Sequence, residues 1–170
     1  MSNVTDLLAV LNTSQLQVKD NAVYQVLKGI LDVLPVIQPL KMESGTWLPV
    51  LNFTTTNLGV TYSIQLGSYV KIGNLVFITG HVALTSKGTV TGAAKISGLP
   101  FKSDINSVSG IAVPFLLNFA AAIIAGITFL FDAGSTDIFM FTPVAAGVRN
   151  LVETDFTNTS SFYFNGVYSI

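Results

Sequence analysis

Two apolar runs that meet at a two-residue turn constrain the fold of this chain most. Residues 60–66, VTYSIQL, place an apolar side chain at every second position, the pattern of a strand with one buried face. These positions are Val60, Tyr62, Ile64 and Leu66. Downstream, in YVKIGNLVFITGHVAL, Gly73 and Asn74 separate two apolar runs, and glycine can take the positive φ that a tight hairpin turn needs. The sequence therefore predicts an antiparallel hairpin whose loop is residues 73–74.

Clusters of turn-forming residues divide the rest of residues 43–170 into short segments. They are Ser86–Gly88, Ser97–Pro100, Asp132–Thr136 and Thr157–Ser160. The runs between such clusters, for example 127–131 and 137–141, predict about eight or nine strands and no helix. Many strands joined by tight turns are typical of an antiparallel β-sandwich or jelly roll. We therefore expect a mainly β domain over residues 43–170.

Residues 1–42 follow a different pattern. Apolar residues recur at intervals of three and four, as in the contact stripe of a helix that packs on other helices. The stripe consists of Val23, Val26, Ile30, Val33, Ile37 and Leu40. Asp20 is a suitable N-cap and Pro35 cannot continue a helix, which predicts a short helix over about residues 21–34. Because so short a helix is marginal alone, we expect self-association through this stripe; the alternative is that it packs back on its own β domain.

The composition requires something to cover apolar surface. Charged residues make up 10% of the chain and apolar residues 50%, and the mean hydropathy is +0.62. A lone soluble domain rarely exposes a large apolar patch, so a membrane or a subunit interface should absorb the excess. The formal net charge of −1 comes from scattered single charges, which excludes a basic surface for nucleic acid.

The membrane alternative rests on residues 111–131, which contain no charge and are long enough to cross a bilayer as a helix. Pro114, Asn118 and Gly126 interrupt this segment, and no Lys or Arg closely flanks it. Its last five residues also form one arm of the hairpin expected around Asp132–Thr136. We therefore favour buried strands here and do not expect a membrane-spanning protein.

The chain offers few residues for chemistry. It has no cysteine and a single histidine, His81, which lies in an expected strand with no acid near it in sequence. Asp132 and Asp137 flank a turn, and Glu153 and Asp155 lie in an expected loop, so turn propensity explains them better than a catalytic pair. We predict no catalytic residue, no metal site and no cofactor site. The protein is not expected to be an enzyme.

Trp47 and the five tyrosines are the residues of the chain that could stack on sugar rings. Trp47 lies where the helical pattern gives way to the β pattern, and we expect it to anchor the core of the first strand. Tyr62 shares the apolar face of its strand and should also be core. The position of Tyr69 stays open between core and surface.

Several separated blocks of the chain resemble a known family. GTWLPVL, YVKIGN, LTSKG, ISGLPF and the closing FYFNGVY occur in the order found in β domains of bacteriophage tail-fibre and minor virion structural proteins. The resemblance is best over residues 45–101 and at the C-terminus. It implies a homotrimeric virion protein whose C-terminal β domain lies at the tip of a fibre or spike, with residues 111–131 as inter-subunit strands.

Together these observations predict two regions with separate roles. Residues 1–42 are expected to trimerise and to dock the protein on other virion proteins, and residues 43–170 to be exposed for attachment to a host-surface glycan or protein. The alternative is a head-fibre or decoration protein that stabilises the capsid and binds no receptor. Neither the receptor nor the residues that bind it can be predicted from the sequence.

Overall fold

The computed structural model describes residues 25–26, 28–29, 41–106, 110–120, 123 and 126–170. The chain divides into two compact units, Met1–Leu40 and Lys41–Ile170. In the first unit, residues 25–26 and 28–29 are helical and the side chain of Val26 is exposed. The other stripe residues, Val23, Ile30, Val33, Ile37 and Leu40, lie outside the described residues. Trimerisation through this stripe therefore stays a prediction.

The described part of the second unit contains twelve strands, and a 3-10 turn precedes the last of them. The strands are β1 (Met42–Trp47), β2 (Val50–Phe53), β3 (Thr56–Leu58), β4 (Thr61–Ile72), β5 (Leu75–Ser86), β6 (Thr89–Thr91), β7 (Ala94–Ser97), β8 (Gly110–Phe119), β9 (Thr128–Phe131), β10 (Asp137–Val144), β11 (Gly147–Asn150) and β12 (Phe156–Ser169). The 3-10 turn is Glu153–Asp155. The expected number of strands was too low because six of these have only three or four residues, too few to show a period of two.

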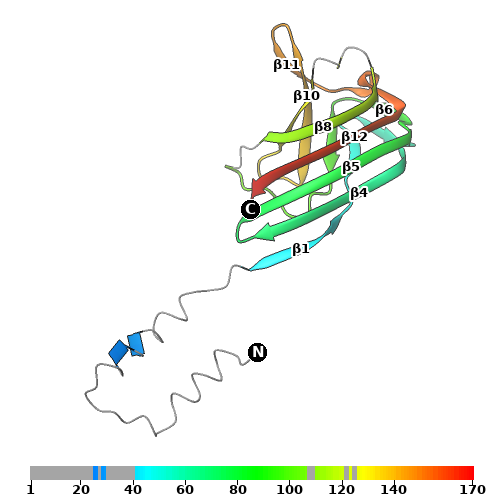
Figure 1. The fold of residues 1–170 in the computed structure, drawn as a ribbon. Helices are drawn as coiled ribbons and strands as arrows, with labels where there is room; N and C mark the ends of the chain where they lie inside the picture. Colours follow the sequence, from blue (N-terminus) through cyan, green and yellow to red (C-terminus); the bar gives the residue numbers. More distant parts are fainter. Residues whose placement is uncertain (1–24, 27, 30–40, 107–109, 121–122, 124–125) are drawn as a thin grey trace. The chain divides into compact units, whose positions relative to one another are not determined.

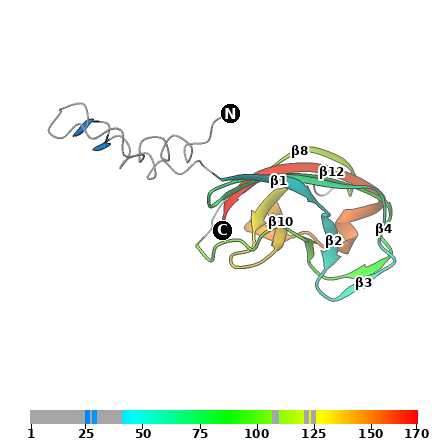
Figure 2. The same ribbon diagram turned by 90° about the horizontal axis from the view of Figure 1, so that it is seen from below.

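Ten of the strands form one antiparallel sheet in the order β1-β4-β5-β12-β8-β9-β10-β7-β2, with β11 paired to β10. The remaining strands, β3 and β6, pair with each other. The large sheet curls, so that β1, β4, β5, β12 and β8 form one layer, and β10 and β2 lie on its other side (Figures 1 and 2). The mainly β, antiparallel prediction is confirmed. The two layers differ from a sandwich of separate sheets, because pairing of β8 with β9 carries hydrogen bonds from one layer to the other.

The predicted hairpin is present. Residues 73–74 join β4 to β5, Ile72 pairs with Leu75, and Gly73 has a φ of 59°. A positive φ at the first loop residue alone fits a type II′ turn. The prediction that Val60, Tyr62, Ile64 and Leu66 share one buried face of a strand is wrong for Leu66. The pairing of β4 with β5 is irregular between Thr61 and Ile64. This irregularity shifts the alternation, and Leu66 is exposed.

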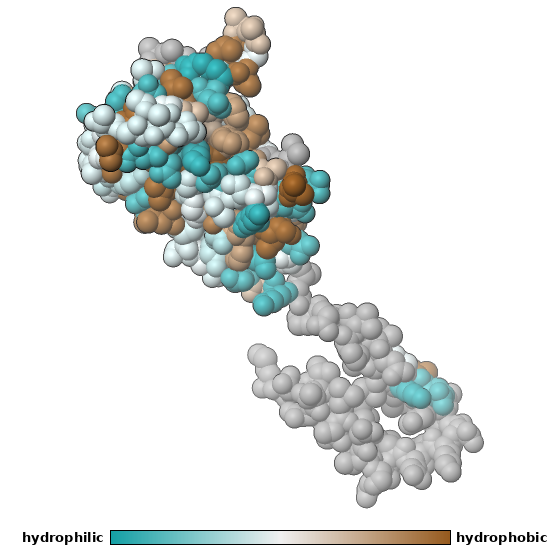
Figure 3. Space-filling model, turned by 180° about the vertical axis from the view of Figure 1, so that it is seen from behind, coloured by the Kyte–Doolittle hydropathy of each residue, from teal (hydrophilic) through white to brown (hydrophobic). Residues whose placement is uncertain are grey.

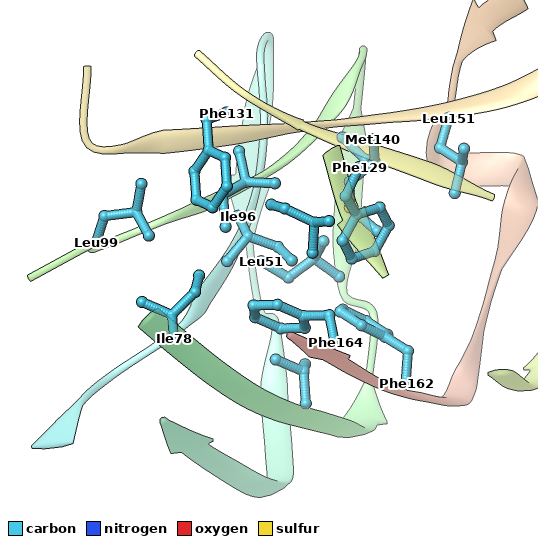
Figure 4. Close-up of a cluster of buried hydrophobic side chains, with 14 of the residues drawn as sticks. Leu51, Ile78, Ile96, Leu99, Phe129, Phe131, Met140, Leu151, Phe162 and Phe164 are labelled. Atoms are coloured by element: carbon cyan, nitrogen blue, oxygen red, sulfur yellow. The ribbon is translucent and has the colours of Figure 1, made fainter. Parts of the chain in front are cut away.

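The core lies between the two layers (Figure 4). It contains Trp47, as predicted. Across β1, β4, β5 and β12, one row of paired residues on the inner face reads Trp47, Gly67, Gly80 and Phe164. The two glycines leave the space that the aromatic rings fill: a β-carbon on Gly67 would collide with Trp47, and one on Gly80 with Phe164. Trp47 also donates a hydrogen bond from Nε1 to the carbonyl oxygen of Thr79, at 3.1 Å.

The apolar segment 111–131 contributes strands. Its described residues belong mainly to β8 and β9, and the hairpin between β9 and β10 is confirmed. Within the described ranges, no helix is both long and apolar enough to cross a membrane. In the single chain, Phe115 and Leu117 of β8 are exposed, and burial of this segment between subunits stays a prediction.

The predicted turn at Thr157–Ser160 is also wrong, because these residues are part of β12. The pairing of β12 with β8 shifts between Phe156 and Ser161. The hydroxyls of Thr157 and Ser160 donate to the carbonyl oxygen of Asn118, at 2.6 and 2.8 Å. These hydrogen bonds stabilise the irregular pairing within a continuous strand. The polar residues that form them are also typical of a turn, which is why the sequence predicted one here.

Candidate functional site: an uncharged sheet face

Three of the four acids singled out in the sequence, Asp137, Glu153 and Asp155, have partners for their side chains. Asp132 and Asp137 lie on either side of the β9–β10 turn, and Asp137 forms an ion pair with Lys95 at 2.6 Å. Glu153 accepts a hydrogen bond from the backbone N–H of Gly92 at 3.0 Å. In the part of the chain that the structure describes, no three His, Asp or Glu side chains are grouped to hold a metal ion.

Asp155 is the one buried acid among those described, and it is fully engaged. Arg149 donates to its two carboxylate oxygens at 2.6 and 2.7 Å, and the backbone N–H of Val152 donates at 2.8 Å. Burial alone would raise the pKa of Asp155, but the hydrogen bonds from Arg149 and Val152 outweigh burial and hold the pKa below its usual range. This network fixes the segment that leads into β12.

The feature that needs a functional explanation is the outward-facing surface of the layer β1-β4-β5-β12-β8, here called the outer face. Strand alternation and the pairing register assign its residues. They are Met42, Ser44 and Thr46 of β1, Ile64, Leu66, Ser68, Val70 and Ile72 of β4, Leu75, Phe77, Thr79, His81, Ala83 and Thr85 of β5, Ser161, Tyr163, Asn165, Val167 and Ser169 of β12, and Ala112, Phe115 and Leu117 of β8. None of these residues is acidic, and none is Lys or Arg.

The five strands contain only two charged residues, Glu43 and Lys71, and both are on the inner side at one end of the layer. Glu43 accepts a hydrogen bond from the hydroxyl of Tyr69 at 3.1 Å, and Lys71 lies over the ring of Phe101 at 5.3 Å. Tyr69 itself is half-buried, with its ring packed edge-on against Phe101. The charges are thus held away from the outer face.

A row of side chains crosses the middle of the outer face. Leu66 of β4, His81 of β5, Tyr163 of β12 and Phe115 of β8 pair in register. The rings of His81 and Tyr163 stack with centroids 3.9 Å apart, and Phe115 packs edge-on against Tyr163 with centroids 5.1 Å apart. His81 and Phe115 therefore flank the Tyr163 ring from the strands on either side, and the stacked imidazole occupies one ring face on which a sugar could otherwise stack.

His81 is held as a neutral residue in this row. Partial burial lowers the pKa of the imidazole below its ordinary value. Its Nε2 lies 3.3 Å from the hydroxyl of Ser161, and its neighbours across the strands are Leu66 and Tyr163. The ring has the surroundings of a packed side chain, and among the described residues no carboxylate bonds to it as one usually does to a catalytic histidine.

Hydroxyl groups on the outer face bond to one another. Ser68 and Thr79 lie 2.7 Å apart through their side-chain oxygens, and the hydroxyl of Thr85 lies 2.7 Å from that of Thr61, which begins β4 beside the outer face. Ser68, Thr79, His81 and Tyr163 border a shallow hollow of about 560 Å³ beside Leu66. Because these hydroxyls already have partners within the sheet, an apolar surface can cover them at small cost.

The opposite side of the domain has a different surface. Figure 3 shows hydrophilic and hydrophobic residues interspersed there. Sequence reasoning missed the outer face because side-chain direction depends on register, as the displacement of Leu66 illustrates. One signal was visible, however: the segments that became β5, β8 and β12 contain no charged residue at all.

Comparisons with known proteins give one informative match. No protein-family model matches the chain, and no curated protein matches it significantly. Among solved structures, the fold is similar to part of the Dettilon tailspike protein (gp208), with a TM-score of 0.66 and 18% sequence identity. The match covers 75% of this chain and 24% of the tailspike, so the chain spans about a quarter of that protein's length. The shared feature is the fold, which thus occurs within a phage tailspike protein.

Proposed function

We propose that this chain is a structural protein of a bacteriophage virion, a homotrimeric fibre or spike without enzymatic activity. Residues 43–170 form the exposed domain that attaches to a host-surface glycan or protein, and residues 1–42 trimerise and dock on other virion proteins. The observation that carries the proposal is the similarity of the fold to part of the Dettilon tailspike protein. The block-by-block resemblance of the sequence to virion β domains, given above, supports it independently.

The arrangement of side chains is consistent with a binding role. Asp137, Glu153 and Asp155 are engaged in ion pairs and backbone hydrogen bonds, and His81 is stacked on Tyr163. What the described surface offers instead is a broad uncharged face, which suits burial against another protein surface within a virion assembly.

The test is electron microscopy of virions labelled with gold-tagged antibody against residues 43–170. We expect gold at the tail or at a vertex spike, and we expect the purified protein to compete with virions for adsorption to host cells. Gold spread evenly over the capsid, with a loss of capsid heat resistance in particles that lack the protein, would instead establish the decoration role. Release of reducing sugar from host glycan by the purified protein would contradict the absence of enzymatic activity.

A further inference from the structure

We propose that the outer face is the surface through which the β domains of neighbouring copies of this chain pack together. This inference rests on the homotrimer proposed above and assigns part of its interface to the β domain. Copies of the chain are preferred over a foreign partner for three reasons: the apolar area exposed, the absence of charge, and the place where residues 1–40 join the domain.

The exposed apolar area has the size of a subunit contact. Eight large residues of the outer face are between 37% and 70% exposed: Met42, Leu66, Val70, Leu75, Phe77, Phe115, Leu117 and Tyr163. Together they expose on the order of 700 Å², given the size of such side chains. The largest apolar patch of a typical monomer is about 300–600 Å². A standard interface buries about 800 Å² from each partner, which the face can supply once its polar groups are included.

The chemistry of the face selects its partner. Because it carries no acid and no Lys or Arg, it has nothing to neutralise a charged partner surface, and a buried unpaired charge is costly. The same face of another copy is equally uncharged. A glycan is a poor match, since its many hydroxyls need free donors and acceptors, whereas Ser68 and Thr79 already bond to each other and the Tyr163 ring is flanked on both sides.

Chain connectivity favours copies over other proteins. β1 begins at Met42, directly after the first unit, and is the edge strand of the layer that carries the outer face. Where residues 1–40 join three chains, each outer face meets two others at an effective concentration of about the millimolar range. Contacts between such faces then need little affinity of their own.

The test compares two leucines in the full chain that are equally exposed, each at 66%: Leu66 on the outer face and Leu58 on β3. Sedimentation equilibrium is measured at pH 8, where His81 is neutral. We expect a trimer for the wild type and for Leu58→Glu, and an increase of about 100-fold or more in the dissociation constant for Leu66→Glu. Circular dichroism checks that both variants fold.

A second measurement covers the case in which residues 1–40 hold the trimer without help. The chain has no cysteine, so Ser68→Cys and Leu58→Cys each introduce a single labelling site. We expect a maleimide to react at least about tenfold more slowly with S68C than with L58C, which supports the inference even where Leu66→Glu remains trimeric.

Two results would overturn the inference, and they differ in what they leave standing. A trimeric wild type with an unaffected Leu66→Glu variant and equal thiol rates would leave the homotrimer but move its interface elsewhere. A monomeric wild type would refute the homotrimer as well, and would leave the outer face to another virion protein or a host molecule.

Discussion

The two faces of the layer β1-β4-β5-β12-β8 are built from the same strands but differ in their surroundings: the inner face packs in the core and the outer face is partly exposed. On the inner face, Gly67 and Gly80 have no side chain, and the rings of Trp47 and Phe164 fill the space above them. One residue along the same strands, Leu66, His81, Tyr163 and Phe115 form a row that remains partly exposed. Both faces exclude acids, Lys and Arg at these rows, which is ordinary for a core and unusual for a surface. The lack of charge, more than apolarity, therefore distinguishes a surface that packs against a partner from an ordinary solvent-exposed surface.

The largest effect is expected on the inner face, for Gly80→Ala. The added β-carbon collides with the ring of Phe164, which is buried and cannot move without disturbing Phe129 and Phe162. Overpacking of this kind should lower the free energy of unfolding by about 3 kcal/mol or more. Urea denaturation followed by tryptophan fluorescence measures it directly, since Trp47 is the only tryptophan.

The matched control is Gly110→Ala in β8 of the same layer. Gly110 has no positive φ, and a β-carbon there would meet no atom within 4 Å. Its unfolding free energy should change by less than about 0.5 kcal/mol. Equal losses in the two variants would show that the Gly80 position is not constrained by Phe164.

An intermediate effect is expected where this domain does hold a charge, at Asp155→Asn. The change leaves Arg149 without its carboxylate partner and weakens the hydrogen bond from the N–H of Val152; because Arg149 stays partly exposed to water, the cost should be about 2 kcal/mol. Because the folded-state pKa of Asp155 lies below the unfolded value, its stabilising contribution is present above about pH 4 and lost as the pH falls further. Denaturation midpoints at pH 7 and pH 3 measure both statements.

Asp137→Asn provides the control for that variant. Asp137 is paired with Lys95, but both side chains are partly exposed, and such a pair contributes about 0.2–1 kcal/mol. A cost for Asp137→Asn as large as that for Asp155→Asn would contradict the view that burial decides where this domain needs paired charges.

The sequence predicted what depends on nearest neighbours and missed what depends on register. The turn at Gly73 could be predicted because a two-residue loop depends only on adjacent residues. Trp47 could be predicted as core from its size and from its position where the β pattern begins. Gly67 and Gly80 could not be recognised as a pair, because their relation exists only once β4 and β5 are aligned. Thr157–Ser160 was misread for a similar reason: its hydroxyls satisfy the carbonyl of Asn118, some forty residues earlier in the chain.

The same limitation hid the outer face. Leu66 was assigned to the buried side because nothing in VTYSIQL signals the irregular pairing between Thr61 and Ile64. The lack of charge in β5, β8 and β12 was visible, but absence of charge fits a strand buried on both sides equally well. The exposure of Phe77, Phe115 and Leu117 in the structure is what distinguishes these strands from core strands buried on both faces.

The smallest effect, and the one that probes the outer face most selectively, is the pH dependence contributed by His81. Its pKa is lowered in the folded protein by partial burial, so the unfolded state binds more protons as the pH falls through about 6.5. The contribution of His81 to stability is therefore complete above that pH and declines below it. Because His81 is the only histidine, His81→Gln should flatten the dependence of Tm on pH between 7 and 5.5, while Ser161→Ala, which keeps the imidazole, should retain it.

If copies of the chain cover the outer face, protonation places an unpaired charge in an interface without acids, and the decline in Tm should be steeper at high protein concentration than at low. An equal decline at both concentrations would mean that His81 senses its own sheet alone.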